Sequence, residues 1–267
     1  MEESAALIYE DKNFLAVYKP ANLLVHPVAA NRKAPACADA SAGRQIAKRE
    51  LTLTDWLIKK YPEIKKVGDE PEIRPGIVHR LDRDTSGVIL IARNQKYFEY
   101  LKHLFQTHQI KKTYLALVYG ELKPKTGVIK KPIRLKSGTI KRTVWKGKME
   151  KEAITEYKVL KILKNSSITN SHDRENLLYF SFLRVLPRTG RTHQIRVHLS
   201  SIGHPVVGDS LYGPKENPFD LKRLFLHAES LEFSTAEGQR IKIESELPKE
   251  LKSFLKILKS ERRTKFF

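Results

Sequence analysis

The chain has 267 residues, of which 40% are hydrophobic and 30% are charged, a balance typical of a folded protein and not of a disordered one. Lysine and arginine number 50 against 30 acidic residues, so the net charge is +20. A field of this sign favours a polyanionic partner, foremost a nucleic acid and otherwise an anionic membrane surface. The single cysteine, Cys37, excludes a disulfide within the chain and a cysteine metal cluster.

No apolar run approaches the ~20 residues that cross a bilayer, and the segment Met1–Ser4 has no basic region followed by an apolar stretch. We therefore expect a cytoplasmic protein with no membrane association. The length favours one large domain over residues 1–267, with an α+β fold of many alternating strands and few helices.

Strands are expected where apolar and polar residues alternate, or where a short apolar run is bounded by turn residues. They are predicted over residues 7–19 (a hairpin that turns at 11–13), 88–92, 111–120, 153–163, 177–186, 224–228 and 231–233. Helices are predicted by apolar spacings of three and four over residues 52–60, 94–105 and 247–258. Loops are expected at 28–50, which is mobile and basic, and at 165–176, and a basic tail at 259–267. Residues 122–151 read as short hairpins with a basic face.

A dense polar turn precedes the apolar run Val88–Ala92. It reads His79-Arg80-Leu81-Asp82-Arg83-Asp84-Thr85-Ser86-Gly87, which is too many hydrogen-bonding groups for the approach to a buried strand unless a site uses them. In extended backbone Arg80 and Asp82 point to the same side, and Leu81 points to the other and can anchor the segment. A guanidinium beside a carboxylate can hold a nucleophile ionised; a surface ion pair of little energetic value is the alternative.

Two further stretches carry side chains of chemical interest. Tyr114 offers a flat face for stacking and a phenol for proton transfer, although a half-buried core tyrosine has the same pattern. Residues 188–199 read Arg-Thr-Gly-Arg-Thr-His-Gln-Ile-Arg-Val-His-Leu, with two histidines five residues apart. No carboxylate joins them and the helical HExxH pattern is missing, so we expect no metal site.

These stretches resemble the motifs of the RluA-type pseudouridine synthases, which isomerise uridine in RNA. The turn 79–87 is similar to the signature of that family, residues 112–120 to its active-site tyrosine motif, and residues 189–196 to its Thr-Gly-Arg-Thr-His-Gln-Ile-Arg motif. The segment from Lys19-Pro20 to His26-Pro27 resembles its first motif. The resemblance implies the pseudouridine synthase fold, which is a bent, mostly antiparallel mixed sheet with flanking helices and a central RNA-binding cleft, and a reaction that needs no cofactor.

The resemblance also implies roles for individual residues. Asp82 is the nucleophile or base, Arg196 is its partner, and Tyr114 stacks on the extruded uracil and is a candidate proton shuttle. Arg80 fills the gap that the extruded base leaves in the RNA. The remaining residues expected at the RNA are His79, Arg191, His193, Ile195 and Lys19. For Lys19 and the two prolines that follow, fixing a sheet edge is the alternative role.

The expected partner is a structured RNA, either rRNA or tRNA, bound by a monomer. Larger members of the family often carry a small RNA-binding module before the first strand, but only about six residues precede Leu7 here. We therefore expect RNA affinity to come from the catalytic domain itself. A candidate surface is formed by the basic residues Arg134, Lys136, Lys141, Arg142, Lys146 and Lys148.

Two other functions fit parts of the pattern. One is a catalytically inactive RNA-binding or ribosome-assembly protein on the same scaffold. The other is a phosphate-ester nuclease, which needs a cluster of carboxylates for Mg²⁺. Asp82 and Asp84 alone do not supply such a cluster.

Overall fold

The computed structural model describes residues 4–27, 50–139, 141–165, 178–215 and 221–260. Its strands are β1 Ala6–Glu10, β2 Phe14–Lys19, β3 Ser86–Ala92, β4 Lys111–Tyr119, β5 Thr126–Lys130, β6 Ile133–Leu135, β7 Arg142–Thr143, β8 Lys148–Lys151, β9 Ile154–Lys164, β10 Tyr179–Pro187, β11 Leu226–Ser234, β12 Arg240–Glu244 and β13 Lys259–Ser260. Its helices are α1 Leu53–Lys60, the 3₁₀ helix η2 Pro62–Lys66, α2 Gln95–Gln106, α3 Gln194–Ser200 and α4 Lys249–Ile257.

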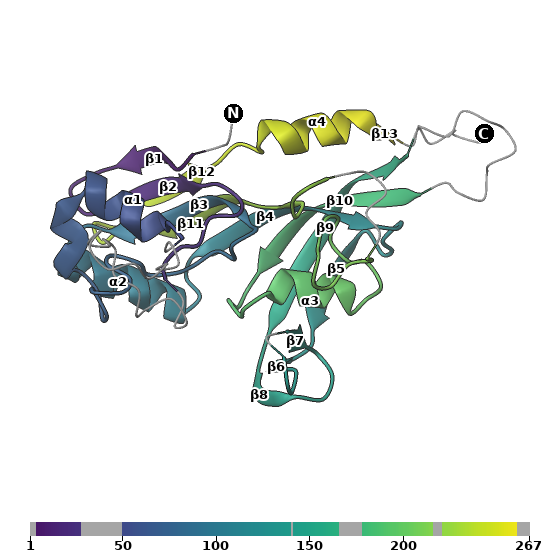
Figure 1. Ribbon diagram of the computed structural model, residues 1–267, viewed down its shortest axis with the longest axis horizontal. Helices are drawn as coiled ribbons and strands as arrows, with labels where there is room; N and C mark the ends of the chain where they lie inside the picture. The colour runs from purple at the N-terminus through teal and green to yellow at the C-terminus, as the bar shows by residue number, and fades with distance from the viewer. Residues whose placement is uncertain (1–3, 28–49, 140, 166–177, 216–220, 261–267) are drawn as a thin grey trace, which may run out of the picture.

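One long sheet organises the molecule. Its strand order is β1-β2-β3-β11-β4-β10-β9-β13, with β12 added at β11 and β5 at β9. All neighbours are antiparallel except β3 and β11, which are parallel. Figure 1 shows two halves, with β1–β3, α1 and α2 in one and β4, β5, β9, β10 and α3 in the other. The expected α+β fold with a mixed, mostly antiparallel sheet is confirmed.

The apolar run of β3 is continuous because both of its faces are covered. Val88 and Leu90 pack in the cluster that α2 completes, and Ile89 and Ile91 pack in the cluster that α1 completes. All four are fully buried. The helices α1 and α2 therefore pack against opposite faces of β3. The turn that precedes this strand is thus attached to a rigid element.

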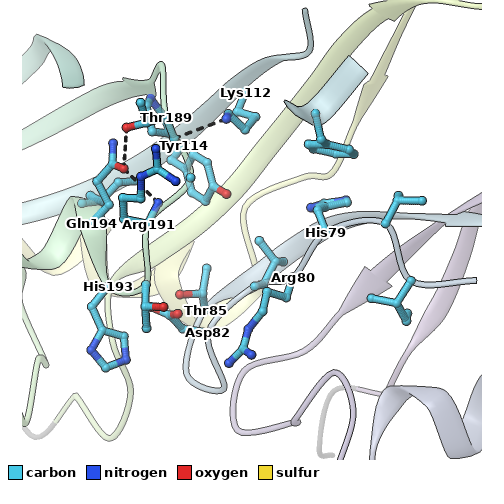
Figure 2. A pocket seen from close by; sticks show the side chains of 18 of the residues that line it. His79, Arg80, Asp82, Thr85, Lys112, Tyr114, Thr189, Arg191, His193 and Gln194 are labelled. Carbon is cyan, nitrogen blue, oxygen red and sulfur yellow. Dashed lines mark hydrogen bonds between the residues drawn. The ribbon is translucent and has the colours of Figure 1, made fainter. Parts of the chain in front are cut away.

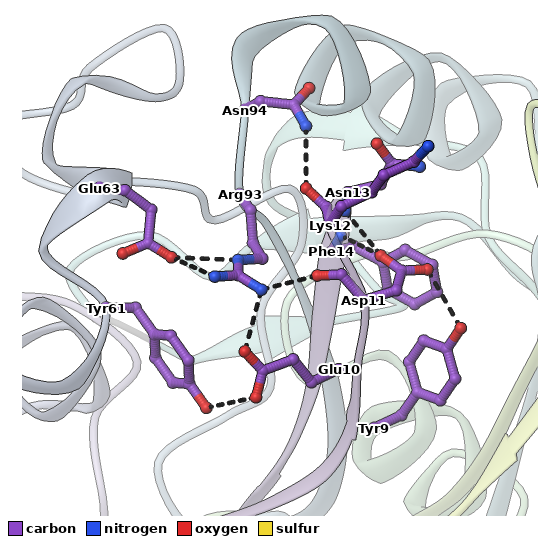
Figure 3. Close-up of polar contacts among 10 residues, drawn as sticks. All are labelled: Tyr9, Glu10, Asp11, Lys12, Asn13, Phe14, Tyr61, Glu63, Arg93 and Asn94. Carbon is purple, nitrogen blue, oxygen red and sulfur yellow. Dashed lines mark hydrogen bonds and ion pairs between the residues drawn. The ribbon is translucent and has the colours of Figure 1, made fainter.

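Polar contacts fix the edge of this half (Figure 3). The Asp11 carboxylate accepts hydrogen bonds from the backbone N–H groups of Asn13 at 2.7 Å and Phe14 at 2.8 Å, which closes the predicted turn between β1 and β2. Arg93, just after β3, forms ion pairs with Glu10 at 2.9 Å and Glu63 at 2.7 Å. The hairpin, η2 and the end of β3 are thus joined at one guanidinium.

The two halves of the sheet meet along a short seam between β3 and β11. Only two residue pairs form it, Ser86 with His227 and Gly87 with Ala228. Gly87 has a φ of +124°, and a Cβ at this position would lie 2.2 Å from the Ala228 carbonyl oxygen. Only glycine fits such an approach. The seam therefore places the polar turn 79–85 at the junction of the two halves.

A small second sheet, in the order β7-β6-β8, projects from the molecule below α3 (Figure 1). We call residues 133–151 the arm. Ile133 and Val144 pack with Val197 of α3 in a small cluster, so the arm has an anchor of its own. Trp145 is 70% exposed on it. The predicted short antiparallel strands are present in the arm, whereas β5, in the same predicted stretch 122–151, pairs with β9 of the main sheet.

Some predicted elements differ from the structure. The two strands predicted at 224–228 and 231–233 are one strand, β11, which begins at Leu226 and contains a register shift between Ala228 and Ser230. Helix α3 was not predicted. The predicted basic tail begins with β13, which pairs with β9. Three predicted stretches lie partly outside the described residues. They are 28–49 of the first loop, 166–176 of the second loop and 261–267 of the tail.

Candidate active site

A cleft of about 620 Å³ lies between the two halves. Its walls come from the turn 77–85, α2, the start of β4 and the segment 187–196, as Figure 2 shows for the principal side chains. Eight of the nine residues expected at the reaction or the RNA line it: His79, Arg80, Asp82, Tyr114, Arg191, His193, Ile195 and Arg196. Segments far apart in the sequence thus converge on one cavity.

Asp82 is presented by a turn that is anchored from below. Leu81 is 5% exposed and packs in the cluster that contains α1, while Arg80 on one side is exposed and Asp82 on the other is partly exposed. The Thr85 backbone N–H donates to the Asp82 carbonyl at 3.2 Å and closes the turn. The predicted alternation of outward Arg80 and Asp82 about an inward Leu81 is confirmed.

Arg196 faces Asp82 from the other half of the molecule. Its Nη1 lies 3.7 Å from Asp82 Oδ2, so the expected ion pair is present. The closer partner of Arg196 is Asp209, whose two carboxylate oxygens accept bonds of 2.7 Å from Nε and Nη2. Such a bidentate pair fixes the plane of the guanidinium. Arg196 therefore holds a fixed orientation and turns its remaining nitrogen to Asp82.

Asp209 is thus a member of the site. It is 3% exposed, and its Oδ1 also accepts bonds from the backbone N–H groups of Leu211 at 2.9 Å and Tyr212 at 3.0 Å. Burial acts to lower the pKa of Arg196, but the hydrogen bonds and charge of Asp209, and then the charge of Asp82, outweigh it and raise that pKa. The guanidinium therefore stays charged beside Asp82.

Tyr114 sits at the seam. In the sheet it pairs with Ala228 of β11, which in turn pairs with Gly87, so the tyrosine lies in the row where β3 begins. Burial, and then the charge of Asp82, raise the pKa of the Tyr114 phenol well above its usual value. The hydroxyl remains protonated at neutral pH and is a hydrogen-bond donor to whatever occupies the cleft.

The segment that carries Arg191 and His193 is held by Gln194. The Gln194 Oε1 accepts bonds from the Thr189 hydroxyl at 2.7 Å and the Arg191 backbone N–H at 3.0 Å, and its Nε2 donates to the Ile154 carbonyl at 3.0 Å. His193 has a left-handed backbone, with a φ of 55°. The Nδ1 of His193 lies 2.8 Å from the Tyr212 hydroxyl, which fixes the ring at the cleft.

His79 supports the opposite wall. Its Nε2 accepts a bond of 2.9 Å from the Leu90 backbone N–H, and its ring stacks on Phe105 with centroids 4.2 Å apart. Burial, and then the nearby charge of Lys112, lower the pKa of His79 to about 3. A neutral ring that already accepts from the backbone gives the cleft a flat wall and no positive charge.

The structure corrects the expectation that Lys19 contacts RNA. Its side chain is 0% exposed, and its ammonium donates to the carbonyls of Pro20 at 2.7 Å, Leu23 at 2.7 Å and Arg83 at 2.9 Å. All three donors are used inside the protein, so no contact with RNA remains for it. The bond to Arg83 ties the first motif to the turn that carries Asp82.

Asp209, Tyr212 and Gln194 are the functional residues that sequence reasoning missed as such. The sequence does mark Asp209 as a carboxylate that follows the apolar pair Val206-Val207 and Gly208. No local pattern indicates that its partner is Arg196, 13 residues earlier. Among the described residues, no group of three or more His, Cys, Asp or Glu side chains is placed to hold a metal ion. No helix in the described ranges is long and apolar enough to cross a membrane.

Comparisons with known proteins identify a family for this chain. A family model described as RNA pseudouridylate synthase matches residues 13–201. The chain is 34% identical over 251 residues to ribosomal large subunit pseudouridine synthase D of Borreliella burgdorferi, which covers 94% of this chain and 67% of that protein. It is 39% identical over 223 residues to an uncharacterised RNA pseudouridine synthase of Aquifex aeolicus, with coverages of 84% and 60%.

The solved structure of human RNA pseudouridylate synthase domain containing 1 has the same fold, with a TM-score of 0.71 at 24% identity over 97% of this chain and 89% of that one. Fold, cleft and motifs together define an isomerase of the class that modifies uridine in RNA. The chain belongs to the RNA pseudouridylate synthase family, in its RluA-type branch.

Proposed function

We propose that this protein converts a specific uridine of ribosomal RNA to pseudouridine, with Asp82 as the nucleophile or base. The observation that carries the proposal is the placement of Asp82 in the cleft, opposite a buried Arg196 that Asp209 fixes in orientation. The choice of ribosomal RNA rests on the name of the Borreliella burgdorferi relative; a transfer RNA is the alternative substrate.

The chemistry is an isomerisation. The bond from ribose C1′ to uracil N1 breaks, the base turns, a bond from C1′ to C5 forms, and the proton leaves C5 while N1 gains one. Asp82 either forms a transient covalent bond or removes a proton, and the guanidinium of Arg196 stabilises its negative charge. Tyr114, protonated at neutral pH, lies where it can stack on the turning base and donate a hydrogen bond to it.

The target base must leave the RNA stack, which costs on the order of a few kcal/mol. Arg80 is exposed at the edge of the cleft, beside Asp82 in Figure 2, and lies where its side chain can enter the vacated position. His79, Arg191, His193 and Ile195 form the walls around the base and its neighbours. In this proposal the carboxylate of Asp82 reacts, and the surrounding side chains bind and position the nucleotide.

The arm supplies a second RNA contact in this proposal. Lys136, Lys146 and Lys148 are exposed on it, and Trp145 beside them offers a stacking surface. Arg134 is instead held within the arm, where it bonds the Glu150 carboxylate and the Val144 carbonyl. The exposed lysines therefore carry the electrostatic part of the contact.

The test is pseudouridine mapping of total RNA from cells with and without this protein, rescued by wild type or by Asp82→Asn. We expect one or a few uridines to lose the modification and only wild type to restore it. Purified Asp82→Asn should still bind that RNA with nearly the wild-type Kd. If no site changes, or if Asp82→Asn restores the modification, the proposal is wrong and an inactive RNA-binding protein becomes the better account.

A further inference from the structure

Thr85 presents a buried hydroxyl with no partner at the wall of the cleft. The residue is 2% exposed and lines the cavity. Among the residues that the structure describes, none forms a hydrogen bond with its Oγ1. Most buried polar groups in proteins are paired, because an unpaired one costs the free energy of its lost hydration. A persistent exception at a binding site calls for an explanation.

The backbone fixes this hydroxyl relative to the reacting carboxylate. The Thr85 N–H donates to the Asp82 carbonyl at 3.2 Å, and the next residue, Ser86, opens β3 and pairs with His227 across the seam. Thr85 is therefore clamped between the turn and the strand, and Figure 2 shows its side chain beside Asp82. Thr85 and Asp82 therefore line the same cleft from one turn.

We infer that Thr85 is a substrate-binding residue, whose hydroxyl forms a hydrogen bond to the nucleotide on which Asp82 acts. A hydroxyl both donates and accepts, so it can bond a ribose hydroxyl or a uracil carbonyl. Tyr97 and Arg142 also have a buried atom without a hydrogen bond among the described residues, but neither of them lines the cleft. The inference rests on the proposed function and adds a residue to it.

The test compares Thr85→Val, which keeps the shape and removes the hydroxyl, with Thr85→Ser, which keeps the hydroxyl. The probe is a synthetic RNA hairpin that contains the uridine identified by mapping. We expect Thr85→Val to lower kcat/KM about tenfold, as for the loss of one hydrogen bond to substrate, and Thr85→Ser to stay within about threefold of wild type. The Tm of RNA-free Thr85→Val should equal or exceed that of wild type, because an unpaired hydroxyl leaves a buried site.

Thr54→Val is the matched control. Thr54 is also 2% exposed, but its hydroxyl bonds that of Thr52 at 2.8 Å in α1, away from the cleft. This variant should lower the Tm and leave kcat/KM unchanged, the reverse of the Thr85→Val pattern. The two variants therefore separate a functional hydroxyl from a structural one.

The outcomes are distinct. If wild type forms product and Thr85→Val matches its kcat/KM, the inference is overturned and the proposed function stands; a hydroxyl bonded only to water gives this result. A lower Tm for Thr85→Val with a proportional loss of folded protein also overturns it. If wild type forms no product from any mapped RNA, both proposals fail. A hairpin with a 2′-deoxyuridine target locates the bond, because Thr85→Val has no further effect on that substrate if the ribose hydroxyl is the partner.

Discussion

Asp209 fixes Arg196 opposite Asp82 but does not itself line the cleft. Its replacement should therefore lower both the stability and the activity of the protein. Asp209→Asn leaves a buried Arg196 with only the more distant Asp82 as an ionic partner. Loss of one member of a buried ion pair is strongly destabilising, and we expect a decrease of about 3 kcal/mol in the free energy of unfolding, measured with urea, and a large fall in kcat.

The control is Glu156→Gln, which breaks the exposed pair with Arg188 at 2.8 Å. Exposed pairs contribute about 1 kcal/mol or less, so this variant should stay close to wild type in both measurements. An Asp209→Asn protein as stable and as active as Glu156→Gln would contradict the role assigned to Asp209.

The buried Lys19 predicts how the stability of the protein depends on pH. Burial lowers its pKa to about 7, although the charges of Asp82 and Asp84 oppose this. Between pH 7 and about 10 the unfolded chain therefore binds a proton that the folded chain does not, so the stability due to Lys19 rises with pH. The cost of Lys19→Met should be constant below pH 7 and should increase above it, by up to about 1.4 kcal/mol per pH unit.

Urea unfolding at half-unit steps from pH 6 to 9 measures this difference. Lys96→Met, on the exposed side of α2, is the control and should show no such slope. A cost of Lys19→Met that is the same at pH 6 and pH 9 would show that the lysine stays charged in the folded protein.

At the scale of elements, the seam between β3 and β11 is the most sensitive point. Gly87→Ala places a methyl group 2.2 Å from a backbone oxygen at a φ of +124°, so we expect a loss of at least about 3 kcal/mol and a separation of Asp82 from Arg196 that abolishes turnover. Gly138→Ala has a similar backbone, with a φ of +71°, but nothing within 4 Å. It should cost only about 1 kcal/mol of backbone strain and leave activity intact; equal effects of the two variants would show that contact at the seam is unimportant.

Periodicity alone predicted most elements correctly, and the departures have physical causes. Helix α3 has only seven residues and includes the β-branched Ile195 and Val197, so tertiary packing and not intrinsic propensity determines it. The polar pair Glu229-Ser230 interrupts the apolar pattern of β11 because a bulge lies there.

In the site, the turn around Asp82 was predictable because its pattern is local. The bond from Arg196 to Asp209 was not, since it joins segments that only the fold brings together. The burial of Lys19 runs against the usual exposure of lysine, and only the three carbonyls around it explain why it is tolerated.

For the whole molecule, the net charge of +20 predicts RNA binding that weakens with salt. Replacing Lys146 and Lys148 of the arm by glutamine should reduce the slope of log affinity against log salt by about 0.7 to 0.9 for each lysine that meets a phosphate. The same change at Lys249 and Lys256, on α4 at the opposite side of the molecule (Figure 1), should leave the slope unchanged. Equal slopes for the two double variants would place the RNA elsewhere.

The path of β11 through the sheet has a consequence for how the protein is made. Leu231 and Phe233 complete the core around β2, β3 and α2, while Leu226 packs in the core of the other half. The segment with Asp82 is synthesised well before residues 226–234. Until these residues emerge, β3 lacks its second neighbour, β11, and the first core lacks Leu231 and Phe233. The nascent chain therefore carries an incomplete first half while residues 93–225 are synthesised, and the cleft forms only after β11 has emerged.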